Sequence, residues 1–237
     1  MMQTIFLGVQ TGPNVEINGI SYRKSQIPIN KKTLLELVYE KFSNSSNIIA
    51  LDSADTNLFR DHEFEKTKIV EIRNRTKGAL GTLGMLLDEL DPVLPILVVP
   101  TDSFISNSRG LIDSLAQNQT LDASIITFYE TSKIFSYARI IENEVVEISE
   151  KNPISRNALA GIFYFRDTSV LKKAIEWSLV NKVTLNGLYY VAPAINALIA
   201  NGLTIGVHKI ERSEYFRFSD SESADQNLRR FNEQAEH

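Results

Sequence analysis

The sequence contains no cysteine in its 237 residues. This absence excludes disulfides, thiolate metal sites and thiol nucleophiles, and it fits a cytoplasmic protein. The three histidines, His62, His208 and His237, do not form a cluster with metal-ligand spacing, so we do not expect a zinc hydrolase.

Long hydrophobic runs and a strong charge of either sign are also missing. No apolar stretch approaches the length of a membrane span. The amino terminus has neither a basic region nor a signal-length apolar core, so we expect no membrane partner and no secretion signal. The net charge of −4 argues against a nucleic-acid partner, which usually requires a basic patch, although local charge can still serve phosphate ligands.

Hydrophobic residues make up 43% and charged residues 23% of the chain, as in ordinary globular proteins. Continuous apolar stretches predict strands at 4–9, 47–51, 68–72, 96–99, 123–128, 158–165 and 204–210. Between them, helical periodicity predicts helices at 31–42, 78–90, 110–116, 168–179 and 190–201, and a polar, helical tail starts at residue 220. Residues 53–66 suit either a short helix or a loop.

Residues 137–148 are typical of a β-hairpin with its turn at Glu142-Asn143-Glu144. Alternating strands and helices with this late hairpin insertion predict an α/β fold of the Rossmann-like, doubly wound type. Its sheet should be mixed and mostly parallel, with helices on both faces. The sequence shows no internal repeat and no low-complexity linker, so we expect a single domain over residues 1–237.

The most informative segment, residues 94–102, is a hydrophobic run that ends in a lone carboxylate, Asp102. Its centre has no polar alternation, which is typical of a strand buried on both faces of a parallel sheet. Ligands of open α/β sheets bind just beyond the carboxyl ends of such strands. We therefore expect Asp102 either to hold a metal ion or polar ligand, or only to cap the following helix.

A second candidate is the loop after the first predicted strand, which contains Gly8 and Gly12 and is followed by Arg23 and Lys24. Backbone amides of such a loop can cradle phosphates, and a lysine at its far end can neutralise them. The loop matches neither the Walker A nor the Gly-x-Gly-x-x-Gly pattern. Taken alone, it is typical of an ordinary surface loop.

Three further segments can contribute. Residues 76–82, Thr-Lys-Gly-Ala-Leu-Gly-Thr, open a predicted helix, where small residues let a flat ring approach free amides and hydroxyls; a plain helix start is the alternative. Glu150 and Lys151 end a hairpin strand opposite a strand that carries Gly161, and they can hold a hydroxyl and a phosphate or form only a solvated pair. Asp220 is an N-cap, a second carboxylate near Asp102, or both.

In this order the segments resemble the sugar-phosphate nucleotidyltransferase family, which includes nucleoside-diphosphate-sugar pyrophosphorylases and choline-phosphate cytidylyltransferases. Residues 24–36 look like the family's Pro-Lys motif and its helix, 76–83 its nucleotide-base segment, and 95–102 its metal-aspartate strand. Glu150-Lys151 with residues 161–165 looks like the sugar-phosphate segment, the most specific match. Residues 189–202 are similar to a late helix of the family, and the run through Asp220 is a loose match to its second metal aspartate.

One departure concerns the first loop. The family's loop ends in Gly-Thr-Arg, whereas this chain has Gly8-Val-Gln-Thr-Gly-Pro-Asn-Val-Glu16. The arginine that would clamp the β- and γ-phosphates is missing, and Arg23 stands where the family motif has proline. Either Arg23 replaces the lost charge from a different position, or triphosphate binding has been lost.

The resemblance implies a nucleotidyltransferase that condenses a nucleoside triphosphate with a sugar 1-phosphate or similar phosphorylated alcohol and releases pyrophosphate, for surface polysaccharide synthesis. It implies Mg²⁺ as the cofactor. The implied site residues are Asp102 and Asp220 for the metal, Lys24, Asp102 and Lys151 for catalysis, Gly8, Gln10, Gly78 and Thr82 for the nucleotide, and Glu150, Lys151 and Gly161 for the second substrate.

Two alternatives stay open. A catalytically degenerate relative would bind a nucleotide or sugar nucleotide as a regulatory protein, an interpretation that the altered first loop keeps open. A glycosyltransferase would use the activated sugar, but the strand end at Asp102 continues with Ser103 and carries no Asp-x-Asp pair. The sequence also leaves open whether the chain forms a homo-oligomer.

Overall fold

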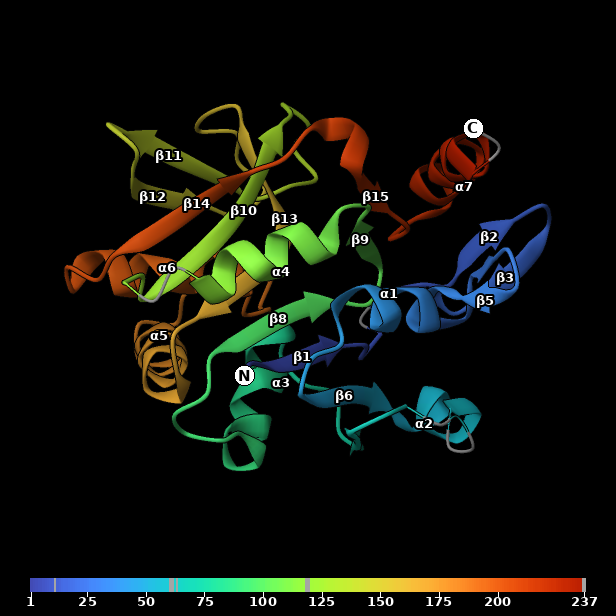
Figure 1. Cartoon of the computed structure of the whole chain (residues 1–237), viewed down its shortest axis with the longest axis horizontal. Coiled ribbons are helices and arrows are strands. Elements are labelled where there is room, and N and C mark those ends of the chain that lie inside the picture. Colours follow the sequence, from blue (N-terminus) through green and yellow to red (C-terminus); the bar gives the residue numbers. More distant parts are fainter. Residues whose placement is uncertain (11, 60–61, 63, 118–119, 236–237) are drawn as a thin grey trace.

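A mixed sheet of nine strands runs through the computed structural model, which describes residues 1–10, 12–59, 62, 64–117 and 120–235 (Figure 1). Its strands are β1 (Gln3–Leu7), β6 (Ser46–Asp52), β7 (Thr67–Ile72), β8 (Ile96–Pro100), β10 (Ala123–Tyr129), β11 (Tyr137–Ile141), β12 (Glu144–Ser149), β13 (Asn157–Phe165) and β14 (Ile205–Lys209). The spatial order is β12-β11-β13-β8-β1-β6-β7, and β10 lies between β13 and β14.

The helices and the minor strands surround this sheet. The α-helices are α1 (Leu34–Phe42), α2 (Ser53–Phe59), α3 (Ala79–Leu86), α4 (Ser108–Gln117), α5 (Thr168–Val180), α6 (Val191–Ala200) and α7 (Ser221–Ala235), and short 3-10 turns cover Lys24–Gln26, Leu87–Glu89 and Arg212–Glu214. Two-stranded pairs are formed by β2 (Val15–Ile17) with β3 (Ile20–Tyr22), β4 (Pro28–Ile29) with β5 (Lys32–Thr33), and β9 (Ser103–Ile105) with β15 (Tyr215–Arg217).

Helices cover both faces of the sheet, as the sequence predicts for the doubly wound class (Figure 1). Phe6 and Ile49 pack on one face with the apolar sides of α1 and α4. Ile5 and Ile48, one position away along the same strands, pack on the other face with α3, α5 and α6. Side chains of a strand alternate between its faces, so the continuous apolar strands supply both halves of the core.

The predicted elements are present with small shifts at their ends. Residues 96–99 are buried on both faces in β8, which runs parallel to β1. Residues 53–66, which the sequence left open, begin with α2. The hairpin turn lies at Glu142 and Asn143, which both have positive φ, as a two-residue hairpin turn requires. The Rossmann-like α/β fold is confirmed, and a single domain stays a prediction. No helix of the described chain is both long and apolar enough to cross a bilayer.

The strand β13 is shared between two neighbours on one of its edges. Phe163–Phe165 pair with β8, Ala158 pairs with β11, and β10 takes the opposite edge. Between these contacts lies Gly161, with a φ of 79°, which is unfavourable for any residue with a Cβ. The pairing with β10 shifts register at the same level, between Ile125 and Thr127. This bulge opens a fork between β8 and β11.

A second constraint joins the amino-terminal ends of α3 and α6. The Tyr189 N–H donates to the Lys77 carbonyl over 2.8 Å, and the Leu80 N–H donates to the Tyr189 carbonyl over 3.2 Å. Gly78 lies between them with a φ of 94°, and a Cβ there would come within 2.4 Å of the Tyr189 carbonyl oxygen. Only glycine allows this approach of the two backbones.

This contact predicts that Gly78→Ala is more destabilising than Gly202→Ala. Both glycines have positive φ, but a Cβ on Gly202 would meet no atom within 4 Å. Gly202→Ala should cost about 1 kcal/mol from backbone strain alone, whereas Gly78→Ala adds a clash with backbone atoms that cannot move independently. Urea denaturation of the two variants measures the difference, and equal costs would contradict a close packing at Gly78.

Candidate functional site

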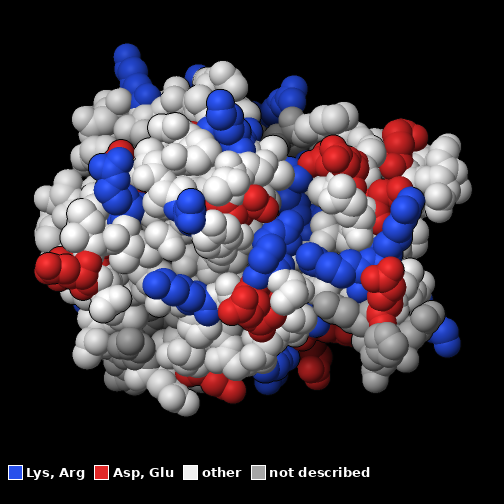
Figure 2. All heavy atoms as spheres, turned by 90° about the horizontal axis from the view of Figure 1, so that it is seen from above, with Lys and Arg blue, Asp and Glu red and all other residues white. Residues whose placement is uncertain are grey.

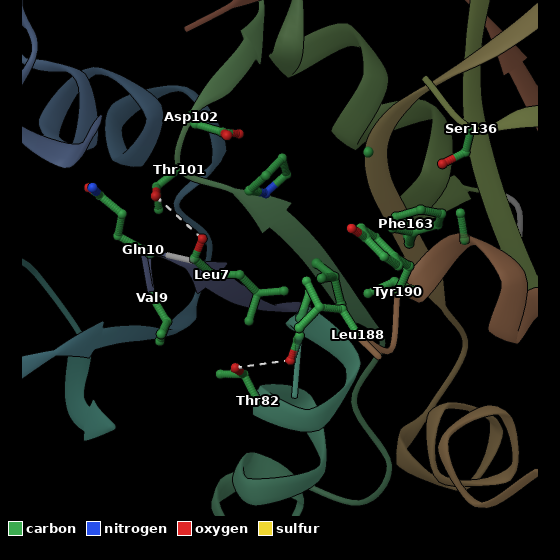
Figure 3. Close-up of a pocket in the computed structure, with 18 of the residues that line it drawn as sticks. Leu7, Val9, Gln10, Thr82, Thr101, Asp102, Ser136, Phe163, Leu188 and Tyr190 are labelled. Atoms are coloured by element: carbon green, nitrogen blue, oxygen red, sulfur yellow. Dashed lines mark hydrogen bonds between the residues drawn. The ribbon is translucent and has the colours of Figure 1, made fainter. Parts of the chain in front are cut away.

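A cavity of about 260 Å³ lies beyond the carboxyl ends of β1 and β8, in the fork beside β13 (Figure 3). After β1 the chain adds β6 and β7 on one side and returns to place β8 on the other, so the strand order reverses at this point. Such switch points leave a crevice above the sheet. The predicted site residues that line it are Gly8, Gln10, Lys24, Gly78, Thr82, Asp102, Glu150 and Gly161.

The end of β1 continues directly into the cavity wall. The Gly8 N–H donates to the Ala50 carbonyl of β6 over 2.8 Å. A Cβ on Gly8 would lie 2.6 Å from Leu51 Cδ2 and 3.3 Å from the Thr101 hydroxyl. Glycine is therefore required here because the loop passes between the ends of β6 and β8.

Opposite charges meet at this end of the cavity. Lys24 Nζ lies 3.7 Å from Asp102 Oδ2, and the two side chains are 17% and 28% exposed. The Ser219 hydroxyl donates to the same Asp102 oxygen over 2.7 Å, and the Phe218 N–H donates to the Asp102 carbonyl. Asp102 is thus held from two directions while its carboxylate faces the cavity (Figure 3).

The Gln10 side chain ties the first loop to Lys24. Its Oε1 accepts the Lys24 backbone N–H over 3.1 Å. Its Nε2 donates to the Gly12 carbonyl and to Asn14 Oδ1 over 3.1 and 3.0 Å. These contacts fix the loop onto the turn that begins at Lys24, so Gln10 positions the lysine through the backbone.

Arg23 points into a carboxylate pair and does not line the cavity. Its guanidinium forms ion pairs with Asp52 and, over 2.6 Å, with Asp55, whose side chain is 1% exposed. The hydrogen bond that it donates to Asp55 is the main cause that raises the pKa of Arg23, against the opposing effect of burial. Arg23 is therefore engaged within the chain, which weakens the hypothesis that it replaces the missing phosphate clamp.

Asp220 lies outside the cavity lining, although Ser219 beside it contacts Asp102. Asp220 Oδ1 accepts the Ser223 N–H over 2.9 Å, and Oδ2 accepts a hydrogen bond from Arg217. Partial burial opposes ionisation, but these bonds hold the pKa of Asp220 below its usual value. The N-cap prediction is confirmed by this geometry. The metal role of Asp220 stays a prediction, and the described residues contain no cluster of three or more acidic or histidine ligands.

At the α3 end of the cavity, polar groups of the helix start bond to one another. The Thr76 and Thr82 hydroxyls lie 2.8 Å apart, and the Thr82 N–H donates to the Gly78 carbonyl over 3.1 Å. Thr82 and Gly78 both line the cavity beside Leu7 and Val9 (Figure 3). The apolar side chains of Leu7 and Val9 beside this end suit a flat ring.

The opposite end carries a partly buried carboxyl group, Glu150. The Ser136 hydroxyl donates to Glu150 Oε2, and burial is the main cause that raises the pKa of Glu150, against the effects of this bond and of Lys151. Lys151 has a φ of 52°. Its Nζ lies 3.5 Å from the Tyr190 hydroxyl and 5.3 Å from the centre of the ring, so it reaches the rim and not the lining of the cavity.

Sequence reasoning missed several side chains at the site. Ser136, Tyr190 and Ser219 each contact a predicted residue, and Ser136 and Tyr190 also line the cavity with Phe163 and Leu188 (Figure 3). Lone serines and tyrosines at element ends carry no local signal. Only the proximity of Tyr190 to the predicted late helix hints at its place.

On the face shown in Figure 2, several basic side chains adjoin one another from the centre to the right, and acidic side chains lie beside them. Exposed pairs of this kind include Arg139 with Glu147 and Arg229 with Asp225, each at 3.0 Å. Such pairs contribute little to stability.

Solved structures share this architecture. A nucleoside-diphosphate-sugar pyrophosphorylase from Vibrio cholerae matches with a TM-score of 0.79 at 21% identity, over 95% of this chain and 99% of that one. An inositol-1-phosphate CTP transferase from T. maritima matches with a TM-score of 0.73 at 12% identity, over 98% and 97%. A CMP:2-keto-3-deoxy-manno-octonic acid synthetase complexed with CTP matches at 0.71 and 12%, over 99% and 100%.

No protein-family model matches the sequence, and no curated protein matches it. At these identities the likeness is one of fold. The chain has the sugar-phosphate nucleotidyltransferase fold.

Because burial raises the pKa of Glu150, the difference in stability between the wild-type protein and the Glu150→Gln variant should depend on pH. A carboxyl with a raised folded pKa binds its proton more tightly in the folded state, so stability falls as pH rises from the ordinary value of 4.5 towards the folded pKa. The glutamine amide of the variant cannot ionise and avoids this loss. Thermal melting should therefore favour Glu150→Gln at neutral pH, with the advantage shrinking below pH 4.5. A pH-independent difference would contradict burial of the ionised group.

The ion pair between Arg23 and Asp55 predicts that mutations of the two residues have non-additive effects on the free energy of unfolding. Arg23→Ala leaves the buried Asp55 carboxylate without its cationic partner, with the Gln26 amide still donating to it, at a cost of about 3 kcal/mol. In an Asp55→Asn background the same change should cost at least about 1 kcal/mol less, because the charge is already gone. Arg139→Ala, which breaks an exposed pair, is the control with little expected cost. Additive unfolding free energies would refute the ion pair.

Proposed function

We propose that the protein is a nucleotidyltransferase that joins a nucleoside monophosphate, taken from a nucleoside triphosphate, to a sugar 1-phosphate or similar phosphorylated alcohol and releases pyrophosphate. The observation that carries the proposal is the convergence of eight predicted residues, from Gly8 to Gly161, on one cavity at the β1–β8 switch point. The shared fold with solved nucleotidyltransferases supports the same kind of reaction. A role in surface polysaccharide synthesis is part of this proposal.

The reaction needs little covalent help from the protein. The attacking phosphate monoester is already an anion near neutral pH, so no general base is required. The barrier lies in bringing two polyanions together in line and in stabilising charge on the α-phosphate and the leaving pyrophosphate. A cation fixed at the cavity wall meets that need, and Lys24 is held there by its backbone bond to Gln10 and by Asp102.

The donor set of the cavity fits Mg²⁺ in part. Mg²⁺ in phosphoryl-transfer sites is held by one or two carboxylates together with substrate phosphates and water. Asp102 lines the cavity and offers such a carboxylate, whereas Asp220 would join only by giving up its bonds to Arg217 and Ser223. When bound, the ion would neutralise phosphate charge beside Asp102.

The two ends of the cavity then have separate roles. Gly8 and the α3 end with Gly78 and Thr82 would receive the nucleotide, because they line the cavity beside apolar side chains that suit a flat base. Glu150, at the far end beside Ser136 and Gly161, would hold hydroxyls of the second substrate. Lys151 at the rim would attract its phosphate.

A second function, binding of a nucleotide or sugar nucleotide without catalysis, is favoured by one specific observation. Among the described residues that line the cavity there is no arginine, and Arg23 is engaged with Asp52 and Asp55. A triphosphate would therefore meet Lys24 as its main cationic contact. Weak triphosphate binding with retained sugar-nucleotide binding would fit a regulatory protein.

Pyrophosphate release separates the two functions. The assay combines each of the four ribonucleoside triphosphates, and dTTP, with a panel of sugar 1-phosphates and phosphorylated alcohols in the presence of Mg²⁺. Release that requires both substrates supports the transferase. Calorimetric binding of a nucleotide or sugar nucleotide with no release for any combination supports the regulatory protein and contradicts the first proposal.

Asp102→Ala should lower turnover by at least about 10²-fold while the protein stays folded, because the change removes the carboxylate beside the reacting phosphates. Asp113→Ala, on the exposed side of α4, is the matched control and should keep full activity. Circular dichroism melting checks the fold of both variants. An active, folded Asp102→Ala enzyme would overturn the assignment of this carboxylate.

A further inference from the structure

Helix α6 buries an almost entirely apolar face and carries one amide within it. Its buried residues are Val191, Ala192, Ala194, Ile195, Ala197 and Leu198. Asn196 lies among them and is only partly exposed. A polar group at such a position is costly unless it is hydrogen-bonded, so the partner of Asn196 is informative.

That partner is one residue of the edge strand β12. Asn196 Oδ1 accepts the Ile148 N–H over 2.8 Å, and Asn196 Nδ2 donates to the Ile148 carbonyl over 2.8 Å. This pair of bonds reproduces what a neighbouring strand would offer. Ile148 stands opposite Ala138 of β11, yet its N–H turns outward to α6. The amide thus takes the place of a further strand at the open edge of the sheet.

The contact lies close to the second-substrate end of the cavity. Ile148 precedes Glu150 by two positions, and Asn196 follows Tyr190 by six. Tyr190 contacts Lys151 through its hydroxyl and ring. Two contacts therefore join segment 148–151 to helix α6 and its N-cap: Asn196 with Ile148 and Tyr190 with Lys151. Glu150 lies between these two contacts in the sequence. Lys151 keeps a positive φ at this junction, a conformation that needs support from its surroundings.

We propose that Asn196 is a positioning residue: its two hydrogen bonds to Ile148 set the register in which Glu150 and Lys151 stand against the amino-terminal end of α6. Asn196 does not line the cavity. Its effect passes through the β12 backbone to the side chains that receive the phosphorylated second substrate. The inference rests on the proposed function for its kinetic consequence. The pair of hydrogen bonds between Asn196 and Ile148, called the clamp below, is independent of any reaction.

The clamp is tested first by amide hydrogen exchange on the whole protein. In Asn196→Ala the Ile148 N–H loses its acceptor and should exchange at least about tenfold faster, because β12 has no further strand to protect it. Asn181→Ala, which removes an exposed amide bond at the end of α5, is the matched control and should leave Ile148 unchanged. Unchanged protection of Ile148 in Asn196→Ala would overturn the proposal.

Steady-state kinetics then tests the role. Asn196→Ala should raise the KM for the phosphorylated second substrate about tenfold and leave the KM for the nucleoside triphosphate within about twofold. Lys151→Ala should also raise the KM for the phosphorylated second substrate. An unchanged KM for the second substrate, or an equal rise of both constants, would show that Asn196 is merely structural.

If the wild-type protein shows no turnover, the proposed function fails and the positioning claim is judged separately. Glu150 can be followed by carbon NMR of its carboxyl group across pH. Loss of the clamp should let water reach Glu150 and move its raised pKa towards the ordinary value, whereas Asn181→Ala should not change it. An unaltered Glu150 titration in Asn196→Ala would overturn the claim.

Discussion

The cavity exists because one edge of β13 is divided between two strands. β8 takes its carboxyl-terminal end and β11 its amino-terminal end, and neither pairs with Gly161. A continuous ladder would satisfy more backbone groups, so this opening needs a bulge and a residue that accepts positive φ. Where that fork meets the switch point between β1 and β8, the sheet gains a concave surface with polar strand ends.

The walls of the cavity are held by contacts between elements remote in sequence. Gly78 lets α3 meet the segment before α6, Ser219 fixes Asp102, and Asn196 fixes the end of β12. Each of these contacts constrains the backbone or the side chain at the cavity wall, and the surface that faces the cavity stays available to a ligand. A site made in this way is preorganised, because its side chains do not have to be ordered when a ligand arrives.

The two neighbouring basic residues near the cavity have different roles. Lys24 faces the cavity, whereas its neighbour Arg23 is turned into the Asp52–Asp55 pair. The arginine thereby stabilises the turn that carries the lysine, since burying Asp55 without a partner would be costly. The Gln10 amide completes this support. A first loop that contains no arginine is thus compatible with a well-fixed cation at the cavity wall.

Local patterns in the sequence determined the strands, the helices and the position of Asp102, because periodicity and turn residues act over a few positions. Residues 96–99 had to be a buried strand, and the Glu150–Lys151 pair had to follow the hairpin. Only the tertiary structure decided that Arg23 pairs with Asp55, that Ser219 meets Asp102, and that Ser136 meets Glu150. A short polar side chain has many possible partners, and the fold alone selects which of them comes within hydrogen-bonding distance.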